Sequence, residues 1–147
     1  MQKKFALVLA SIPHEVKKVE RFISTVKRFA RLDEDRYYRV LVATTEAVNN
    51  GIIHGNLRDP KKKVTVTCIV SQSVLIIRVH DEGPGFDAAH LPNPLTRENL
   101  LREHGRGVFL IRSLMDNVEF ERHENGSDVI MKISLTQPAG AIPQKTK

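Results

Sequence analysis

The sequence contains a single cysteine, few aromatic residues and no long apolar run. Cys68 has no partner for a disulfide within the chain, and its alternating apolar surroundings predict a buried thiol in a reducing cytoplasm. Aromatic residues make up 5% of the chain, which is few for stacking on nucleic-acid bases. No apolar run approaches the length of about 18 residues that a membrane-spanning helix needs. We therefore expect a cytoplasmic protein without direct contact with nucleic acid or membrane.

Length and composition predict one soluble domain. The chain has 147 residues, of which 41% are hydrophobic and 27% charged, enough to form a real core. The net charge of +6 is spread along the chain rather than gathered in a nucleic-acid-binding motif. The first residues have lysines before an apolar stretch, as a signal peptide does, but that stretch is only about six residues long and favours a strand. We expect a domain over residues 1–137 and a flexible tail over residues 138–147.

The hydrophobic spacing predicts an α+β fold. Ser11 and Asp33 are expected to cap the first two helices, and Asn125–Gly126 predicts a hairpin turn. Strands gathered into hairpins, with helices apart from them, indicate a two-layer sandwich in which helices cover one face of a mostly antiparallel mixed sheet. Strands are expected at residues 3–10, 63–70, 74–80, 118–122 and 128–135, and helices at residues 14–31, 35–53, 96–103 and 108–115.

A polar group is expected on the second helix. Glu46 and Asn50 are four residues apart, so both project from one face, with Asn49 beside them and His54 one turn further. A carboxylate and a carboxamide offer oxygen ligands to a hard cation such as Mg²⁺, which needs few protein ligands when phosphates complete its shell. Taken alone, the same residues could equally be the polar end of a helix that stops at Gly55.

Two glycine-containing loops follow. In the first, Asp81 leaves an apolar strand and can accept a hydrogen bond from an exocyclic amine, while Gly83 and Gly85 allow a ligand to approach the backbone closely. A turn of this composition is also a common way to end a strand. In the second, Gly105 and Gly107 open a helix, where free backbone N–H groups can hold phosphate; on its own this pattern is weak evidence.

The combination of these segments is much more specific than any one of them. The wording ATTEAVNNGIIHGN, VHDEGPGFD and GRGVFLIRSLMD resembles the bacterial anti-sigma-factor serine/threonine kinases. These kinases belong to the ATPase superfamily of DNA gyrase, Hsp90, histidine kinases and the MutL mismatch-repair ATPases. The resemblance covers about residues 5–135 and implies that superfamily's ATP-binding fold.

The resemblance also implies a role for each matching residue. Glu46 is expected to be the general base, Asn50 the Mg²⁺ ligand and Asp81 the acceptor for the adenine amine of ATP. Residues 88–104 are expected to form a mobile lid. The remaining nucleotide-binding residues implied by the resemblance are Asn49, His54, Gly83, Gly85, Phe86, Gly105, Arg106, Gly107, Val108 and Phe109.

The implied function is a serine-protein kinase that phosphorylates a small anti-sigma-factor antagonist and sequesters a sigma factor, commonly as a homodimer. A nucleotide-dependent binding module that transfers phosphate poorly is the alternative, and the presence of both Glu46 and Asn50 favours the enzyme. One departure concerns the last strand, where family members often carry a threonine near the adenine and this chain has Ser127 followed by Asp128. Ser127 could replace the threonine, but Asp128 would be an unusual residue so near Asp81, and we expect adenine recognition to differ in detail. The separations of His54, His80 and His104 lack the short ligand spacing of a transition-metal site, and Cys68 has no partner cysteine, so such a site is unexpected there.

Overall fold

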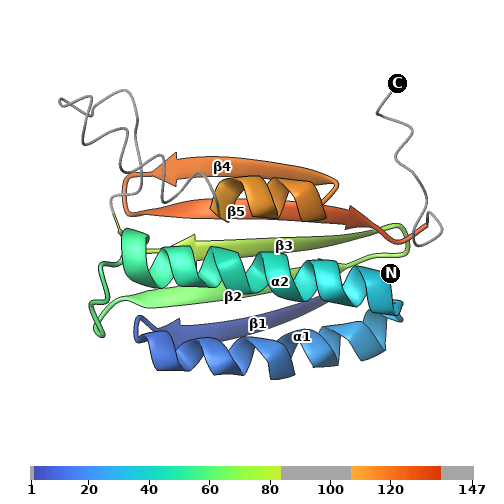
Figure 1. The fold of residues 1–147 in the computed structure, drawn as a ribbon, viewed down its shortest axis with the longest axis horizontal. Coiled ribbons are helices and arrows are strands. Elements are labelled where there is room, and N and C mark those ends of the chain that lie inside the picture. The colour runs from blue at the N-terminus through green and yellow to red at the C-terminus, as the bar shows by residue number, and fades with distance from the viewer. Residues whose placement is uncertain (1, 84–106, 137–147) are drawn as a thin grey trace.

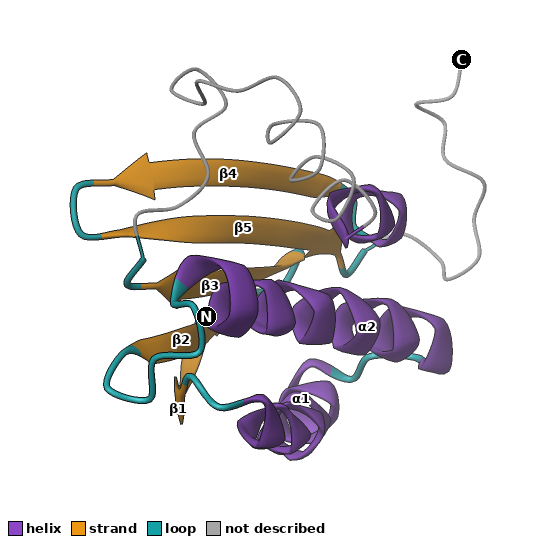
Figure 2. Ribbon diagram, turned by 60° about the vertical axis from the view of Figure 1, so that its left-hand side comes forward, coloured by secondary structure: helices purple, strands orange, loops and turns teal. Residues whose placement is uncertain are grey.

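The computed structural model describes residues 2–83 and 107–136, which form two layers. One layer is a five-stranded sheet in the order β1-β2-β3-β5-β4, and every pairing in it is antiparallel. The other layer is helical and covers one face of this sheet (Figures 1 and 2). The strands are β1 (Lys3–Ala10), β2 (Lys63–Val70), β3 (Val74–Asp81), β4 (Asn117–His123) and β5 (Gly126–Ser134).

The helical layer consists of α1, α2 and a third helix over residues 107–114. A short 3-10 turn, η1 (Pro13–Val16), leads into α1 (Lys17–Ala30). The helix α2 (Glu34–Asn50) continues into a wider π-helical turn, η2 (Gly51–Gly55). The predicted second helix is therefore correct in position, but its last turn has a different winding.

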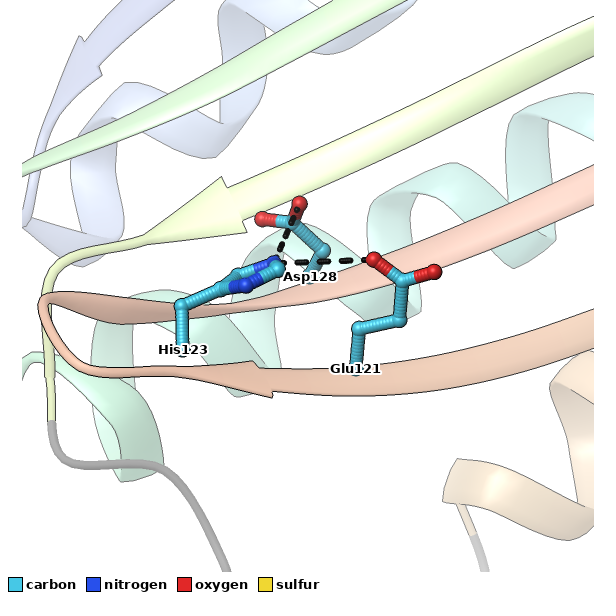
Figure 3. Close-up of side chains that lie close together, drawn as sticks. All are labelled: Glu121, His123 and Asp128. Carbon is cyan, nitrogen blue, oxygen red and sulfur yellow. Dashed lines mark hydrogen bonds and ion pairs between the residues drawn. The ribbon is translucent and has the colours of Figure 1, made fainter.

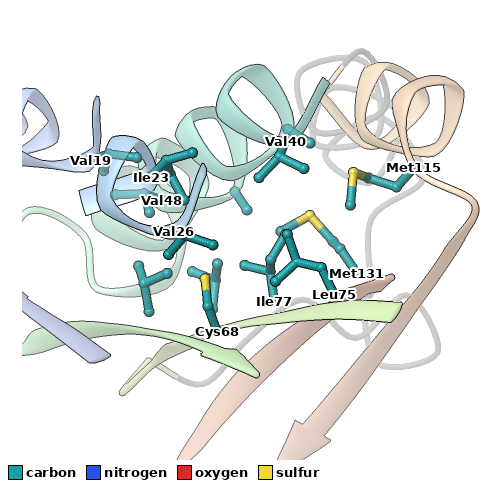
Figure 4. Packing of buried hydrophobic residues seen from close by; sticks show 14 of the residues in the cluster. Val19, Ile23, Val26, Val40, Val48, Cys68, Leu75, Ile77, Met115 and Met131 are labelled. Atoms are coloured by element: carbon teal, nitrogen blue, oxygen red, sulfur yellow. The ribbon is translucent and has the colours of Figure 1, made fainter. Parts of the chain in front are cut away.

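The core lies between the sheet and the helices (Figure 4). Strand residues alternate between the two faces, so Val66, Cys68 and Ile77 point toward the helices and are fully buried. Val19 and Ile23 recur at helical spacing on α1 and meet them from the other side. The expected burial of the Cys68 thiol is confirmed, and this burial raises its pKa to about 12.

Polar contacts position the helices on the sheet. Asp33 caps α2 as expected, because its Oδ1 accepts a hydrogen bond from the backbone N–H of Arg36 at 2.8 Å. The Arg36 side chain then donates from Nε to the carbonyl of Ser134 at 2.7 Å and so ties the start of α2 to the end of β5. The expected cap at Ser11 is wrong: its hydroxyl donates to the Lys62 carbonyl at 2.8 Å and joins the end of β1 to the turn before β2.

The α+β sandwich expected from the sequence is confirmed, with the strands close to their expected bounds. The predicted helix over residues 96–103, the lid over residues 88–104 and the tail over residues 138–147 lie outside the described residues. Within the described part of the chain, no helix combines the length and apolarity that crossing a membrane requires.

Two neighbouring isoleucines on β3 test which face of the sheet carries the core. Ile77 is fully buried against the helices, whereas Ile76 points to the other face and is half-buried. We expect Ile77→Ala to lower the free energy of unfolding by about 2–5 kcal/mol, because it leaves a cavity in packed surroundings. The matched control Ile76→Ala should lower it clearly less. Urea unfolding of both variants and the wild type measures this, and equal losses would contradict the assignment of the faces.

Candidate nucleotide-binding site

The end of α2 meets the third helix at a glycine. Glu46 and Asn50 lie one turn apart on α2, and both are half-buried. A methyl group placed on the Cα of Gly107 would come within 2.6 Å of Glu46 Oε2 and 3.0 Å of Asn50 Nδ2. The second glycine loop therefore ends directly against the acidic and amide side chains, which are more than fifty positions earlier in the sequence.

A second close approach joins η2 to the end of β3. The Asp81 carboxylate lies against the Cα of Gly55, where a methyl group would be 2.5 Å from Asp81 Oδ2. Gly83 packs on the same turn so closely that its methyl group would be 1.6 Å from the Gly55 carbonyl oxygen. Side chains at Gly55 or Gly83 would force these segments apart, so the glycines allow the helix end and the strand end to touch.

Asp81 is a hydrogen-bond acceptor in partly apolar surroundings. Burial raises its pKa, and the backbone N–H of Gly83, which donates to Oδ1 at 3.0 Å, acts in the opposite direction. The carboxylate is thus held by its own turn while facing the helical side of the sheet. An ionised carboxylate in this setting can accept a hydrogen bond from a neutral amine on a ligand.

Asn56 is a residue of this site to which the sequence analysis gave no role. It is almost completely buried, and its side-chain Nδ2 donates to Ser11 Oγ at 2.7 Å and to the Lys63 carbonyl at 3.0 Å. Its Oδ1 accepts from the backbone N–H of Glu82 at 2.8 Å. Asn56 therefore holds the Asp81–Gly83 turn against the end of η2. In the sequence, the signal that could have identified Asn56 is its position directly after Gly55.

The last strand resolves the expected difficulty with Asp128. Ser127 pairs with Asp81 across β3 and β5, so their side chains share the helical face of the sheet. The Ser127 hydroxyl is buried and has no hydrogen-bond partner among the described residues. Asp128, the next residue, points to the opposite face. Its side chain therefore lies on the face opposite the one that carries Asp81, which its position in the sequence did not show.

The remaining expected site residues differ in their exposure to solvent. Asn49, His54 and Val108 are half-buried. The Phe109 side chain is 74% exposed, which leaves it outside any enclosed part of the site. Gly85, Phe86, Gly105 and Arg106 lie outside the described residues, so their expected roles stay predictions.

Comparisons with known proteins identify the family of the chain. Residues 9–133 match the family model of the histidine kinase-like ATPase domain. An anti-sigma F factor of Oceanobacillus iheyensis is 30% identical, with 93% of this chain and 96% of that protein covered. An anti-sigma F factor of Geobacillus stearothermophilus is 35% identical, and that match covers 74% of this chain and 78% of the Geobacillus protein.

A more distant relative is named for its activity, and a solved structure shares the fold. The serine-protein kinase RsbW of Listeria monocytogenes is 26% identical, with 90% of this chain and 88% of the kinase covered. The crystal structure of the RsbU and RsbW domains of a Mycobacterium tuberculosis protein superposes with a TM-score of 0.69 at 15% identity. That match covers 96% of this chain, which spans 35% of the mycobacterial chain. The chain belongs to the histidine kinase-like ATPase domain family and, within it, to the RsbW-like group that includes the anti-sigma F factors.

Proposed function

We propose that this protein is an ATP-dependent serine-protein kinase and anti-sigma factor. The observation that carries the proposal is the convergence of three distant segments: Glu46 and Asn50 meet Gly107, and Asp81 meets Gly55 at the other end of η2. The names of its relatives, anti-sigma F factor and serine-protein kinase, support the same activity.

The residues present fit a magnesium-bound adenine nucleotide. At one end, Asp81 would accept a hydrogen bond from the adenine amine, and the Ser127 hydroxyl, which has no hydrogen-bond partner in the described part of the chain, lies on the same face of the sheet. At the other end, the backbone at Gly107 carries no side chain and opens a helix, which suits phosphate. Asn50 offers its amide oxygen to Mg²⁺, an oxygen-binding ion. When bound, that ion supplies positive charge that offsets the charge of the phosphates.

Glu46 is the proposed general base. Its carboxylate lies beside Gly107, next to the place proposed for the terminal phosphate, and it receives the proton of a serine hydroxyl presented by a second protein. The remaining work is positioning, because phosphoryl transfer depends mainly on alignment and charge neutralisation. Asn56 contributes by holding the turn that carries Asp81.

The proposed partners are a small antagonist protein, whose serine receives the phosphate, and a sigma factor that the kinase sequesters. We further propose that the protein acts as a homodimer in the cytoplasm. A protein that binds its partners with nucleotide but transfers phosphate poorly is the alternative. Phosphate transfer by the wild-type protein separates the two functions.

Asp81→Asn tests the adenine assignment. Because burial raises the folded-state pKa of Asp81, the stability linked to its protonation is present below its unfolded-state pKa and is lost as pH rises through the raised pKa. The ionised carboxylate therefore destabilises the nucleotide-free protein at pH 7. We expect Asp81→Asn to fold at least as stably as the wild type at pH 7 and to lose ATP affinity.

Calorimetry with ATP and urea unfolding without nucleotide measure these two effects. In the wild type, ATP affinity should also decline on acidification at a higher pH than the pKa of an ordinary aspartate would predict. Undiminished ATP binding by a folded Asp81→Asn protein would remove Asp81 from the adenine site.

Glu46→Gln tests the base. The substitution keeps the size of the side chain against Gly107 and removes its ability to accept a proton. We expect ATP affinity to stay within a few fold, whereas phosphate transfer to a serine protein captured from the source cell falls by about 10²–10⁴-fold. Glu34→Gln, at the exposed start of the same helix, is the matched control and should transfer normally. An unchanged rate in Glu46→Gln would show that another group acts as the base.

Asn50→Ala tests the magnesium ligand. Loss of the amide oxygen should weaken ATP binding in the presence of Mg²⁺ and leave binding in excess chelator nearly unchanged, because only the metal-bridged contact is removed. Calorimetric titrations under both conditions give the comparison. Equal losses with and without Mg²⁺ would indicate a general disturbance of the site instead.

A further inference from the structure

We propose that Glu121, His123 and Asp128 form a binding site for Zn²⁺ or a similar divalent transition-metal ion. The site lies on the face of the sheet opposite the helices. The three residues come from the β4–β5 hairpin (Figure 3). Glu121 is directly paired with Asp128 across the two strands, and His123 follows two residues later on the same face. All three residues lie on these paired strands, so strand pairing itself brings their side chains together.

The donor atoms are spaced as a metal ion requires. His123 Nε2 lies 3.1 Å from Asp128 Oδ2 and 3.6 Å from Glu121 Oε1, and all three donor atoms lie within 4.8 Å of one another. A tetrahedral zinc ion with ligands at about 2.0–2.2 Å separates neighbouring ligand atoms by about 3.3 Å. One imidazole and two carboxylates also form a ligand set that zinc accepts, with water in the fourth position.

Asp128 is already held in place for such a role. Its side chain is 6% exposed, and its second oxygen, Oδ1, lies 2.5 Å from Nδ1 of His80 on β3. Burial alone would raise the pKa of Asp128, but hydrogen bonds from His80, Arg78 and His123 outweigh burial and lower it. The carboxylate is thus oriented by a neighbour that leaves Oδ2 for the shared site, as outer partners orient metal ligands.

Arg78 shows that this place attracts a cation. Its Nη1 contacts Asp128 Oδ2 and lies 3.8 Å from Glu121 Oε1, the same two oxygens that the ion would use. The Arg78 side chain is 46% exposed, so it can turn into solvent when an ion replaces it. A metal ion therefore competes with Arg78. If the cluster were only an ion-pair network, Arg78 would stabilise it and would not compete with anything for its oxygens.

The site is separate from the proposed nucleotide site. Neighbouring strand residues point to opposite faces, so Asp81 faces the helices whereas His80 faces the Asp128 cluster. The inference does not rest on the proposed kinase activity, and its failure would leave that activity untouched.

Zinc titration of the chelator-treated full chain, followed by calorimetry, tests the proposal. We expect one Zn²⁺ per chain, with affinity reduced at least about tenfold by His123→Ala and by Glu121→Gln, since even outer-shell changes cost about 10–100-fold. Glu119→Gln, on the same strand and face, is the matched control and should bind as the wild type does. The substituted residues are exposed, and circular dichroism verifies that each variant is folded.

Arg78→Met gives the decisive comparison. Removal of the competing cation should tighten Zn²⁺ binding, and Co²⁺ bound in place of Zn²⁺ should show the visible absorption of a tetrahedral ion, which His123→Ala abolishes. Zn²⁺ should also raise the thermal midpoint of the wild type and not of His123→Ala. Absence of binding, binding unaffected by His123→Ala, or weaker binding in Arg78→Met would each overturn the site in favour of an ion-pair network or scattered surface sites.

Discussion

The close contact between the end of η2 and the end of β3 is the constraint on which the proposed site depends. Gly55 and Gly83 touch backbone to backbone, and the Asp81 carboxylate lies directly on Gly55. No side chain fits between these segments, so the distance from the helix to the strand is set by the main chain itself. Asn56 then secures the contact: its Nδ2 donates to the Lys63 carbonyl and its Oδ1 accepts from the backbone N–H of Glu82. The Asp81 carboxylate, the proposed adenine acceptor, is therefore held in place by the packing of the main chain.

The layers of the fold could be predicted from the sequence because their signals are local. Alternation in residues 63–70 and helical spacing in residues 14–31 each follow from one element burying one face. The Ser11 cap was wrong because a hydroxyl before a proline can serve either a helix or a distant carbonyl, and the Lys62 carbonyl lies 51 positions away. Asn56 was missed for the same reason, since all its partners belong to other elements.

The residues of the proposed site could be proposed from the sequence, but the contacts between them could not. Spacing places Glu46 and Asn50 on one helical face, yet nothing local shows that Gly107 lies against them. In the sequence, Ser127 and Asp128 cannot be distinguished by their distance from Asp81. An acidic residue at position 128 therefore looked incompatible with an adenine acceptor at position 81. Strand geometry removes this incompatibility: Ser127 shares the face of Asp81, and Asp128 joins Arg78 and His80 on the other face. One residue of register thus separates the proposed nucleotide site from a charged cluster.

The sheet separates these two faces sterically, but charge acts through it. Burial is the main reason that the pKa of Asp81 is raised; His80 opposes this rise, and the charge of Asp128 adds to it. Arg78, His80 and His123 surround Asp128, and the positive charge of Arg78 opposes its negative charge. An unpaired carboxylate at Asp128 would favour protonation of Asp81 and weaken its capacity to accept a hydrogen bond. The cluster on the open face therefore makes an acidic residue tolerable one position away from the strand partner of Asp81.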